Sequence, residues 1–97
     1  MNLELKGVHY NISDTTLEFF NKKLERINFA KDNIVDLLIT VTKEKQGYRI
    51  DGNVHFRWGK SAHIGVECFE LYEGIESFID KLELKVRKEK SKIKSHV

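Results

Sequence analysis

From Glu70 to Lys94 the chain reads ELYEGIESFIDKLELKVRKEKSKIK, which predicts one long amphipathic helix. At about 100° per residue, its apolar side chains fall within one arc roughly 100° wide. These side chains are Leu71, Ile75, Phe78, Ile79, Leu82, Val86 and Ile93. An arc of this width is typical of a helix that packs one face on a core. We therefore expect this face to be buried.

The same helix carries a stripe of lysines along one flank of the apolar arc. The stripe consists of Lys81, Lys85, Lys88 and Lys92, spaced four, three and four residues apart. The opposite flank mixes acids and bases as an ordinary solvated surface does, and it holds Glu76, Glu83, Arg87, Lys90 and Lys94. The spacing thus predicts a purely basic strip on one side of the helix only.

Charge is distributed unevenly between the end of this helix and the rest of the chain. The formal net charge is +2, whereas residues 81–94 hold six Lys and one Arg against Glu83 and Glu89, which is +5 and leaves −3 elsewhere. Such asymmetry favours an anionic partner. The alternative is a solvated helix whose charges follow the helix dipole. That effect fades within the last turn, so it accounts for residues 90–94 but not for Lys81 or Lys85.

Length and composition predict a single globular domain, residues 1–97, because 40% of the residues are hydrophobic and 33% are charged. The one cysteine, Cys68, excludes an internal disulfide and a cysteine metal site. No apolar run approaches the roughly 20 residues that a membrane helix needs. The N-terminus also lacks the pattern of a signal peptide. We expect a cytoplasmic protein that does not bind a membrane.

The first third of the chain predicts a short strand and then a helix. Met1–Lys6 alternates apolar and polar residues, which indicates a strand. Ser13 suits the N-cap of a helix that continues to about Ile27, and residues 29–33 are expected to form a loop. The predicted buried stripe of this helix is Leu17, Phe20, Leu24 and Ile27. Its cations are Lys22, Lys23 and Arg26, which taken alone fit a solvated helix end better than a binding site.

Three alternating segments follow, and each predicts a strand. Residues 34–43 are rich in β-branched side chains, with Val35, Leu37, Ile39 and Val41 expected to face inward. Tyr48–Trp58 and Ala62–Cys68 alternate on either side of Gly59-Lys60, which predicts a hairpin. The polar face of the sheet, expected to be open to water, carries Arg49, Asp51, Asn53, His55, Arg57 and His63.

The order of the elements predicts an α+β two-layer sandwich, β-α-β-β-β-α. The last three strands would form an antiparallel meander because short turns join them. The first strand would lie parallel to the second because a helix joins the two. Both helices would then cover one face of a four-stranded sheet.

No catalytic constellation is legible in the sequence. The histidines, which are His9, His55, His63 and His96, lack the spacing of metal ligands, and no glycine-rich phosphate loop is present. One alternative is a metal or proton site formed by His55 and His63 facing each other across the predicted hairpin. We expect no enzymatic activity, no metal and no cofactor.

Several short motifs stand in an order that is more specific than any of them alone. The closing helix contains Glu70-Leu71-Tyr72, Ile75, Asp80-Lys81-Leu82-Glu83 and Arg87-Lys88-x-Lys90 without a gap. Earlier in the chain come Gly7, Ile12-Ser13-Asp14, Lys23-Leu24 and Lys43-Glu44-Lys45. Over nearly its whole length the chain resembles the ribosome hibernation-promoting factor family, also called ribosome-associated inhibitor, in its short form.

The resemblance implies a fold akin to the double-stranded-RNA-binding domain, lodged in the decoding channel of the small ribosomal subunit. Family members there exclude messenger and transfer RNA and keep ribosomes dormant under stress or in stationary phase. Their basic helix residues contact ribosomal RNA, a role that the resemblance carries onto Lys81, Arg87, Lys88 and Lys90. The helical projection adds Lys85 and Lys92. The expected rRNA-binding set is completed by Lys22, Lys23 and Arg26.

The chain departs from the family pattern at two places. Arg57-Trp58-Gly59-Lys60 replaces a usual Asn-Gly-Gly at a hairpin tip, and Phe69 replaces a usually polar residue. Long family members carry a second domain that pairs ribosomes, so for this chain we expect a monomer, and pairing would need a separate ribosome-dimerising factor. The rival hypotheses are a general double-stranded-RNA-binding module and a protein-interaction domain with Trp58 and Phe69 as exposed anchors.

Overall fold

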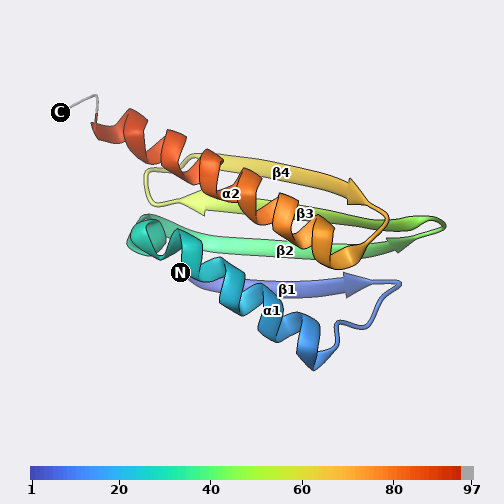
Figure 1. Cartoon of the computed structure of the whole chain (residues 1–97). Helices are drawn as coiled ribbons and strands as arrows, with labels where there is room; N and C mark the ends of the chain where they lie inside the picture. The colour runs from blue at the N-terminus through green and yellow to red at the C-terminus, as the bar shows by residue number, and fades with distance from the viewer. Residues whose placement is uncertain (95–97) are drawn as a thin grey trace.

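The computed structural model of the chain describes residues 1–94, with Lys94 described by its backbone only, so His96 lies outside the described residues. The elements are β1 (Asn2–Val8), α1 (Asp14–Leu24), the 3₁₀ segment η1 (Glu25–Asn33), β2 (Ile34–Glu44), β3 (Gly47–Phe56), β4 (Ser61–Cys68) and α2 (Leu71–Lys94). The strands form one sheet in the order β1-β2-β3-β4, with both helices on the same face (Figure 1). β1 is parallel to β2, and the other neighbours are antiparallel. The predicted two-layer sandwich is confirmed.

α2 buries a single apolar stripe against the sheet, as predicted. The stripe residues without exposed surface are Ile75, Phe78, Ile79, Leu82 and Val86, and Leu71 is half-buried against them. Phe78 packs directly on Gly52 of β3, where a Cβ would lie 2.5 Å from Cζ of Phe78. The prediction is wrong for Ile93, which is 40% exposed. The last turns of α2 extend past the end of the sheet, so this residue has no core beneath it (Figure 1).

The predicted buried stripe of α1 is confirmed for Phe20 and Leu24 but not for Leu17. Ser13 is the N-cap as predicted, since its Oγ accepts a hydrogen bond from the Thr16 amide at 3.2 Å. Thr16 is 3% exposed, whereas Leu17, predicted to be buried, is 39% exposed. The Thr16 hydroxyl can be buried because it has hydrogen-bond partners, among them the hydroxyl of Tyr72 on α2 at 3.2 Å. The helix is therefore turned so that Thr16 takes the inward position.

The first helix also ends earlier than predicted. α1 stops at Leu24, and η1 replaces both the expected turn to Ile27 and the expected loop of residues 29–33. In a 3₁₀ helix, side chains three residues apart lie on one side. Leu24, Ile27 and Ala30 have this spacing, and each is at most 5% exposed. The tighter winding keeps these three side chains against the core.

β2 contains an irregularity at its start. Ile34 pairs with Phe56 and Asp36 pairs with His55, so Val35 is the extra residue of a β-bulge. Ile34 is consequently fully buried and Val35 is only half-buried. The predicted inward position of Val35 is wrong, whereas the other inward positions of this strand are confirmed.

Two leucines of α2 provide a matched test of this packing. Leu82 is fully buried, whereas Leu84 is 69% exposed. Truncation to alanine removes the same atoms from both. We expect Leu82→Ala to lower the free energy of unfolding by about 2–5 kcal/mol and Leu84→Ala to change it by less than about 0.5 kcal/mol. Urea unfolding followed by circular dichroism measures both values, and equal losses would contradict the packing described here.

Candidate nucleic-acid interface

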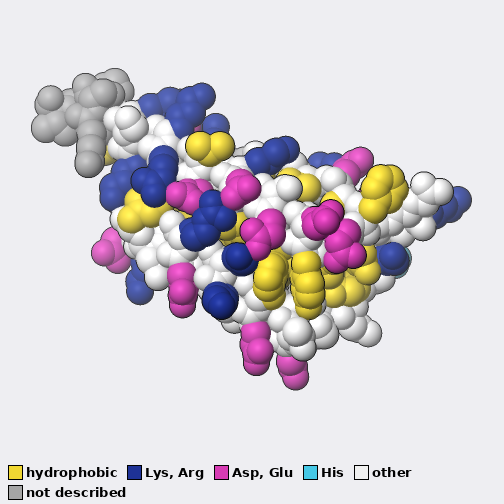
Figure 2. Space-filling view, viewed as in Figure 1, with side chains coloured by type: hydrophobic (Ala, Val, Ile, Leu, Met, Phe, Trp, Pro, Cys, Tyr) yellow, Lys and Arg dark blue, Asp and Glu magenta, His cyan; other side chains and the backbone are white. Residues whose placement is uncertain are grey.

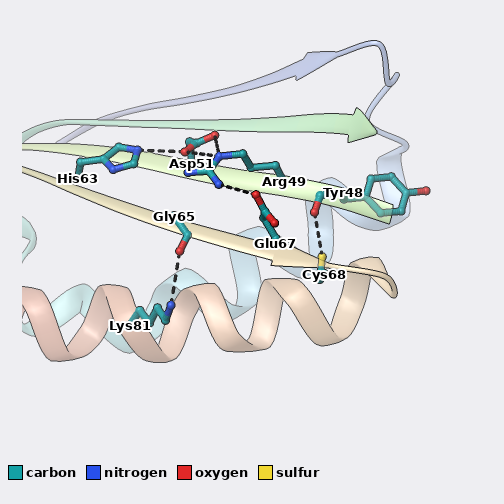
Figure 3. A network of polar contacts seen from close by, with 8 residues as sticks. All are labelled: Tyr48, Arg49, Asp51, His63, Gly65, Glu67, Cys68 and Lys81. Atoms are coloured by element: carbon teal, nitrogen blue, oxygen red, sulfur yellow. Dashed lines mark hydrogen bonds and ion pairs between the residues drawn. The ribbon is translucent and has the colours of Figure 1, made fainter. Parts of the chain in front are cut away.

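The basic flank of α2 runs along the outer edge of β4. A groove of about 390 Å³ lies between α2 and β4. Residues 63–65 form its strand side, and its helix side is formed by Lys81, Leu84, Lys85 and Lys88. Lys81 reaches across, with Nζ 3.5 Å from the carbonyl oxygen of Gly65 (Figure 3). Lys88 is exposed and has no side-chain partner among the described residues. The structure therefore brings these three lysines of the predicted stripe together in one concave surface.

A buried carboxylate lies beside this basic flank. Among the side chains of residues 1–93, Glu89 is the one charged group that is buried, with 1% of its surface exposed. Its Oε2 lies 3.2 Å from Nζ of Lys60. Its Oε1 lies 3.3 Å from Nζ of Lys92 and 3.7 Å from Nζ of Lys85. Burial raises the pKa of Glu89, but hydrogen bonds from Lys60 and Lys92 outweigh this effect and lower the pKa below its ordinary value.

Neither Glu89 nor Lys60 belongs to the predicted site. The helical projection contained a signal for Glu89, because at about 100° per residue it falls roughly 20° from Leu82, in the middle of the apolar arc. An acid in that position requires a cation beside it. No such signal exists in the sequence for Lys60, because its proximity to α2 depends on where the β3–β4 hairpin lies in the folded structure.

The opposite flank of α2 is paired with α1 and η1. Lys23 Nζ lies 2.6 Å from Glu76, and Arg26 Nη2 lies 2.8 Å from Asp80 and 2.7 Å from Glu83. The hydrogen bonds to Asp80 and Glu83 raise the pKa of Arg26 above its usual value. Acidic side chains accordingly lie over the seam between the helices, whereas Lys and Arg side chains gather around the C-terminal half of α2 (Figure 2).

The remaining predicted residues lie near this seam. Arg87 Nε donates to Glu83 at 3.0 Å, and its guanidinium lies 4.3 Å from the ring centroid of Phe29. Hydrogen bonds from Arg26 and Arg87 lower the pKa of Glu83. Lys90 Nζ donates to the Phe29 carbonyl at 2.9 Å. Lys22 is exposed, and the described part of the chain offers it no side-chain partner.

The open face of the sheet holds a separate polar network (Figure 3). Asp51 accepts hydrogen bonds from Arg49 at 3.1 Å and from His63 at 3.0 Å, and Arg49 also binds Glu67 at 3.1 Å. This face is therefore charge-balanced. The register places His63 opposite Asn53 and His55 opposite Ser61, so the alternative in which the two histidines face each other is wrong.

Residues 1–94 contain no group of three or more His, Cys, Asp or Glu side chains placed to hold a metal ion. In the same range, no helix has the length and apolar character needed to cross a membrane.

Known proteins are similar to this chain in both sequence and fold. The family described as "Sigma 54 modulation protein / S30EA ribosomal protein" matches residues 3–94. The ribosome hibernation promoting factor of Escherichia coli (strain K12) is 28% identical over 96 residues, which cover 99% of this chain and 100% of that protein. The protein of the same name from Klebsiella oxytoca is 29% identical with the same coverage.

Solved structures agree with these relatives. A ribosomal subunit interface protein from Coxiella burnetii has a TM-score of 0.85 and 27% identity, covering 94% of this chain and 99% of that one. The N-terminal domain of Thermus thermophilus Protein Y has a TM-score of 0.77 and 25% identity, covering 91% and 98% respectively. The resemblance to the ribosome hibernation-promoting factor family is thus confirmed, and the chain belongs to the sigma 54 modulation protein / S30EA ribosomal protein family.

Proposed function

We propose that this protein is a cytoplasmic, non-enzymatic inhibitor of translation that binds the small ribosomal subunit in its decoding channel. There it would exclude messenger and transfer RNA and keep ribosomes dormant under stress or in stationary phase, with residues 1–97 acting as one ribosome-binding domain. The observation that carries the proposal is the groove beside β4 that Lys81, Lys85 and Lys88 line. The names of the relatives, ribosome hibernation promoting factor and ribosomal subunit interface protein, support it.

The chemistry of the groove suits RNA phosphates. Lysine presents a compact ammonium that binds phosphate as a point charge. Such contacts position a protein on nucleic acid without specifying sequence. With principal-axis extents of 47 × 21 × 19 Å, the chain is elongated, and its volume is what would obstruct the channel. Inhibition by this protein is therefore steric.

The predicted contacts divide according to their partners in the structure. Lys81, Lys85, Lys88 and Lys92 on the groove side are the principal proposed contacts. Lys22, Arg87 and Lys90 add positive charge near η1. Lys23 and Arg26 would contact RNA with ammonium and guanidinium groups that already bind acids of α2. Their main effect is to align α1 and η1 with α2.

Removal of two groove lysines tests the proposed surface. Lys85 and Lys92 contact Glu89, so Lys81→Gln with Lys88→Gln is the cleaner change. Each lost phosphate contact reduces the slope of log affinity against log salt by about 0.7–0.9, so the pair should reduce it by about 1.5. Co-sedimentation with small ribosomal subunits over a salt series measures the slope. The matched control, Lys6→Gln with Lys45→Gln, removes the same charge from two exposed positions elsewhere, and an equal effect of both pairs would refute the assignment.

Arg26 and Lys88 separate a structural role from a binding role. Arg26→Gln breaks the contacts with Asp80 and Glu83, so we expect a lower urea midpoint and an almost unchanged salt slope. Lys88→Gln removes an exposed cation that has no side-chain partner among the described residues, so we expect the same midpoint and a smaller slope. If Arg26→Gln weakened subunit binding more than Lys88→Gln, the division proposed here would be wrong.

Occupancy of the channel has its own test. Small subunits saturated with the protein should lose binding of initiator tRNA and of a short messenger RNA, both measured by filter retention.

A 20-base-pair RNA duplex should compete weakly with the subunit for the protein. Competition at equal concentration would favour the general duplex-binding module. The protein-interaction rival predicts binding that is indifferent to the lysines. Of its two anchors, Phe69 is 81% exposed, but Trp58 is half-buried and stacks on Phe56 at 5.0 Å.

A further inference from the structure

The turn between β3 and β4 is tied to the C-terminal half of α2 through Lys60 and Glu89. The Lys60 side chain keeps 46% of its surface exposed while its Nζ lies 3.2 Å from Glu89, whose own exposure is 1%. A carboxylate buried without a charged partner would be strongly unfavourable. Glu89 therefore needs cations around it, and the fold supplies them from two separate segments.

The cations at Glu89 outnumber the charge that they offset. Lys60 contacts one carboxylate oxygen, and Lys85 and Lys92 contact the other. With three ammonium groups and one carboxylate, the cluster keeps a net charge of +2. An ammonium group has three N–H donors. Lys60 directs one toward Glu89, so the exposed side of its ammonium can donate to an external acceptor.

The cluster continues the groove toward the hairpin tip. Lys85 belongs to both, since it lines the groove and contacts Glu89. On the strand side, His63 lines the groove three residues after Lys60. A phosphate chain lying in the groove would therefore meet this cluster next.

The contact with Glu89 reduces the conformational entropy that Lys60 loses when it binds a ligand. A surface lysine gives up rotamer freedom when it binds a ligand, and one that is already held by an internal partner gives up less. Glu89 holds the ammonium of Lys60 at the mouth of the groove before any ligand arrives. Glu89 therefore affects ligand binding indirectly, by setting the position of the lysines.

We propose that Lys60, Lys85 and Lys92, gathered around Glu89, form a binding site for a backbone phosphate of RNA at the end of the groove. Lys60 is in this view an additional RNA contact supplied by the hairpin tip, and Glu89 is its positioning residue. The inference rests on the proposed function, because it takes ribosomal RNA as the ligand that occupies the groove.

The hairpin lysines allow a matched test of the contact. Lys60→Gln should weaken binding to small subunits roughly fivefold at 0.1 M salt and reduce the salt slope by about 0.7–0.9, as loss of one phosphate contact does. Lys45→Gln removes the same charge from the exposed turn of the other hairpin and should change neither. Lys60→Arg keeps the charge and should restore most of the binding. An affinity of Lys60→Gln equal to that of the unchanged protein overturns the contact.

Glu89→Gln tests the positioning role, with circular dichroism and urea unfolding as the check on folding. The change adds one net positive charge, so if Glu89 merely offset charge, binding to subunits would become tighter. Positioning predicts weaker binding instead. It also predicts that Lys60→Gln has a smaller effect in the Glu89→Gln background than alone, because the two residues act through one cluster.

Tighter binding of Glu89→Gln with an undiminished effect of Lys60→Gln overturns the positioning role. Should Glu89→Gln fail to fold, the Lys60 series still decides whether the hairpin contact exists. Failure of the proposed function looks different from either result: the unchanged protein would then not sediment with small subunits even at low salt.

Discussion

The contact between Phe78 and Gly52 fixes how closely α2 approaches the sheet. A β-carbon at Gly52 would lie 2.5 Å from the Phe78 ring, so only glycine permits this approach without movement. A second close contact lies at the start of the helix, where a β-carbon on Gly74 would lie 2.1 Å from Sγ of Cys68. Two contacts of this kind set the position of α2 along the sheet and its rotation about its own axis. The side on which every charged residue of α2 emerges is therefore a consequence of core packing.

This rotation gives the two flanks of α2 different roles. The flank toward α1 presents Glu76 to a lysine of α1, and Asp80 and Glu83 to an arginine of η1. Exposed ion pairs of this kind contribute little stability each, so they align the two helices more than they hold them together. The flank toward β4 presents lysines with few acids nearby, which concentrates positive potential along the groove. The same residue types thus serve alignment on one side of the helix and attraction of anions on the other.

Hydrophobic periodicity and the lengths of the connections were sufficient to predict the element order, the sheet topology and most of the core, because both signals are local in sequence. Its failures have tertiary causes. Thr16 replaces Leu17 in the core because Tyr72, distant in sequence, offers its hydroxyl a partner. Val35 leaves its predicted position because a β-bulge shifts the strand by one residue.

The candidate site was predictable to a different extent. The stripe of Lys81, Lys85 and Lys88 follows from helical spacing alone, and the structure places all three in one groove. Glu89 was visible as an acid within the apolar arc, although its partners were not. Lys60 could not be found from sequence, because its neighbourhood depends on where a hairpin tip meets a helix nearly thirty residues further along the chain.

The contact of Lys81 with the Gly65 carbonyl has a consequence for how molecules of this protein meet each other. β4 is an outer strand of the sheet, and such strands offer unpaired backbone groups on which another strand can add. Here an ammonium group occupies one of those acceptors, and further lysines stand beside it. Two copies approaching along this margin would bring like charges together before any ladder of amide bonds could form. The row of cations thus opposes edge-to-edge pairing of two copies along β4.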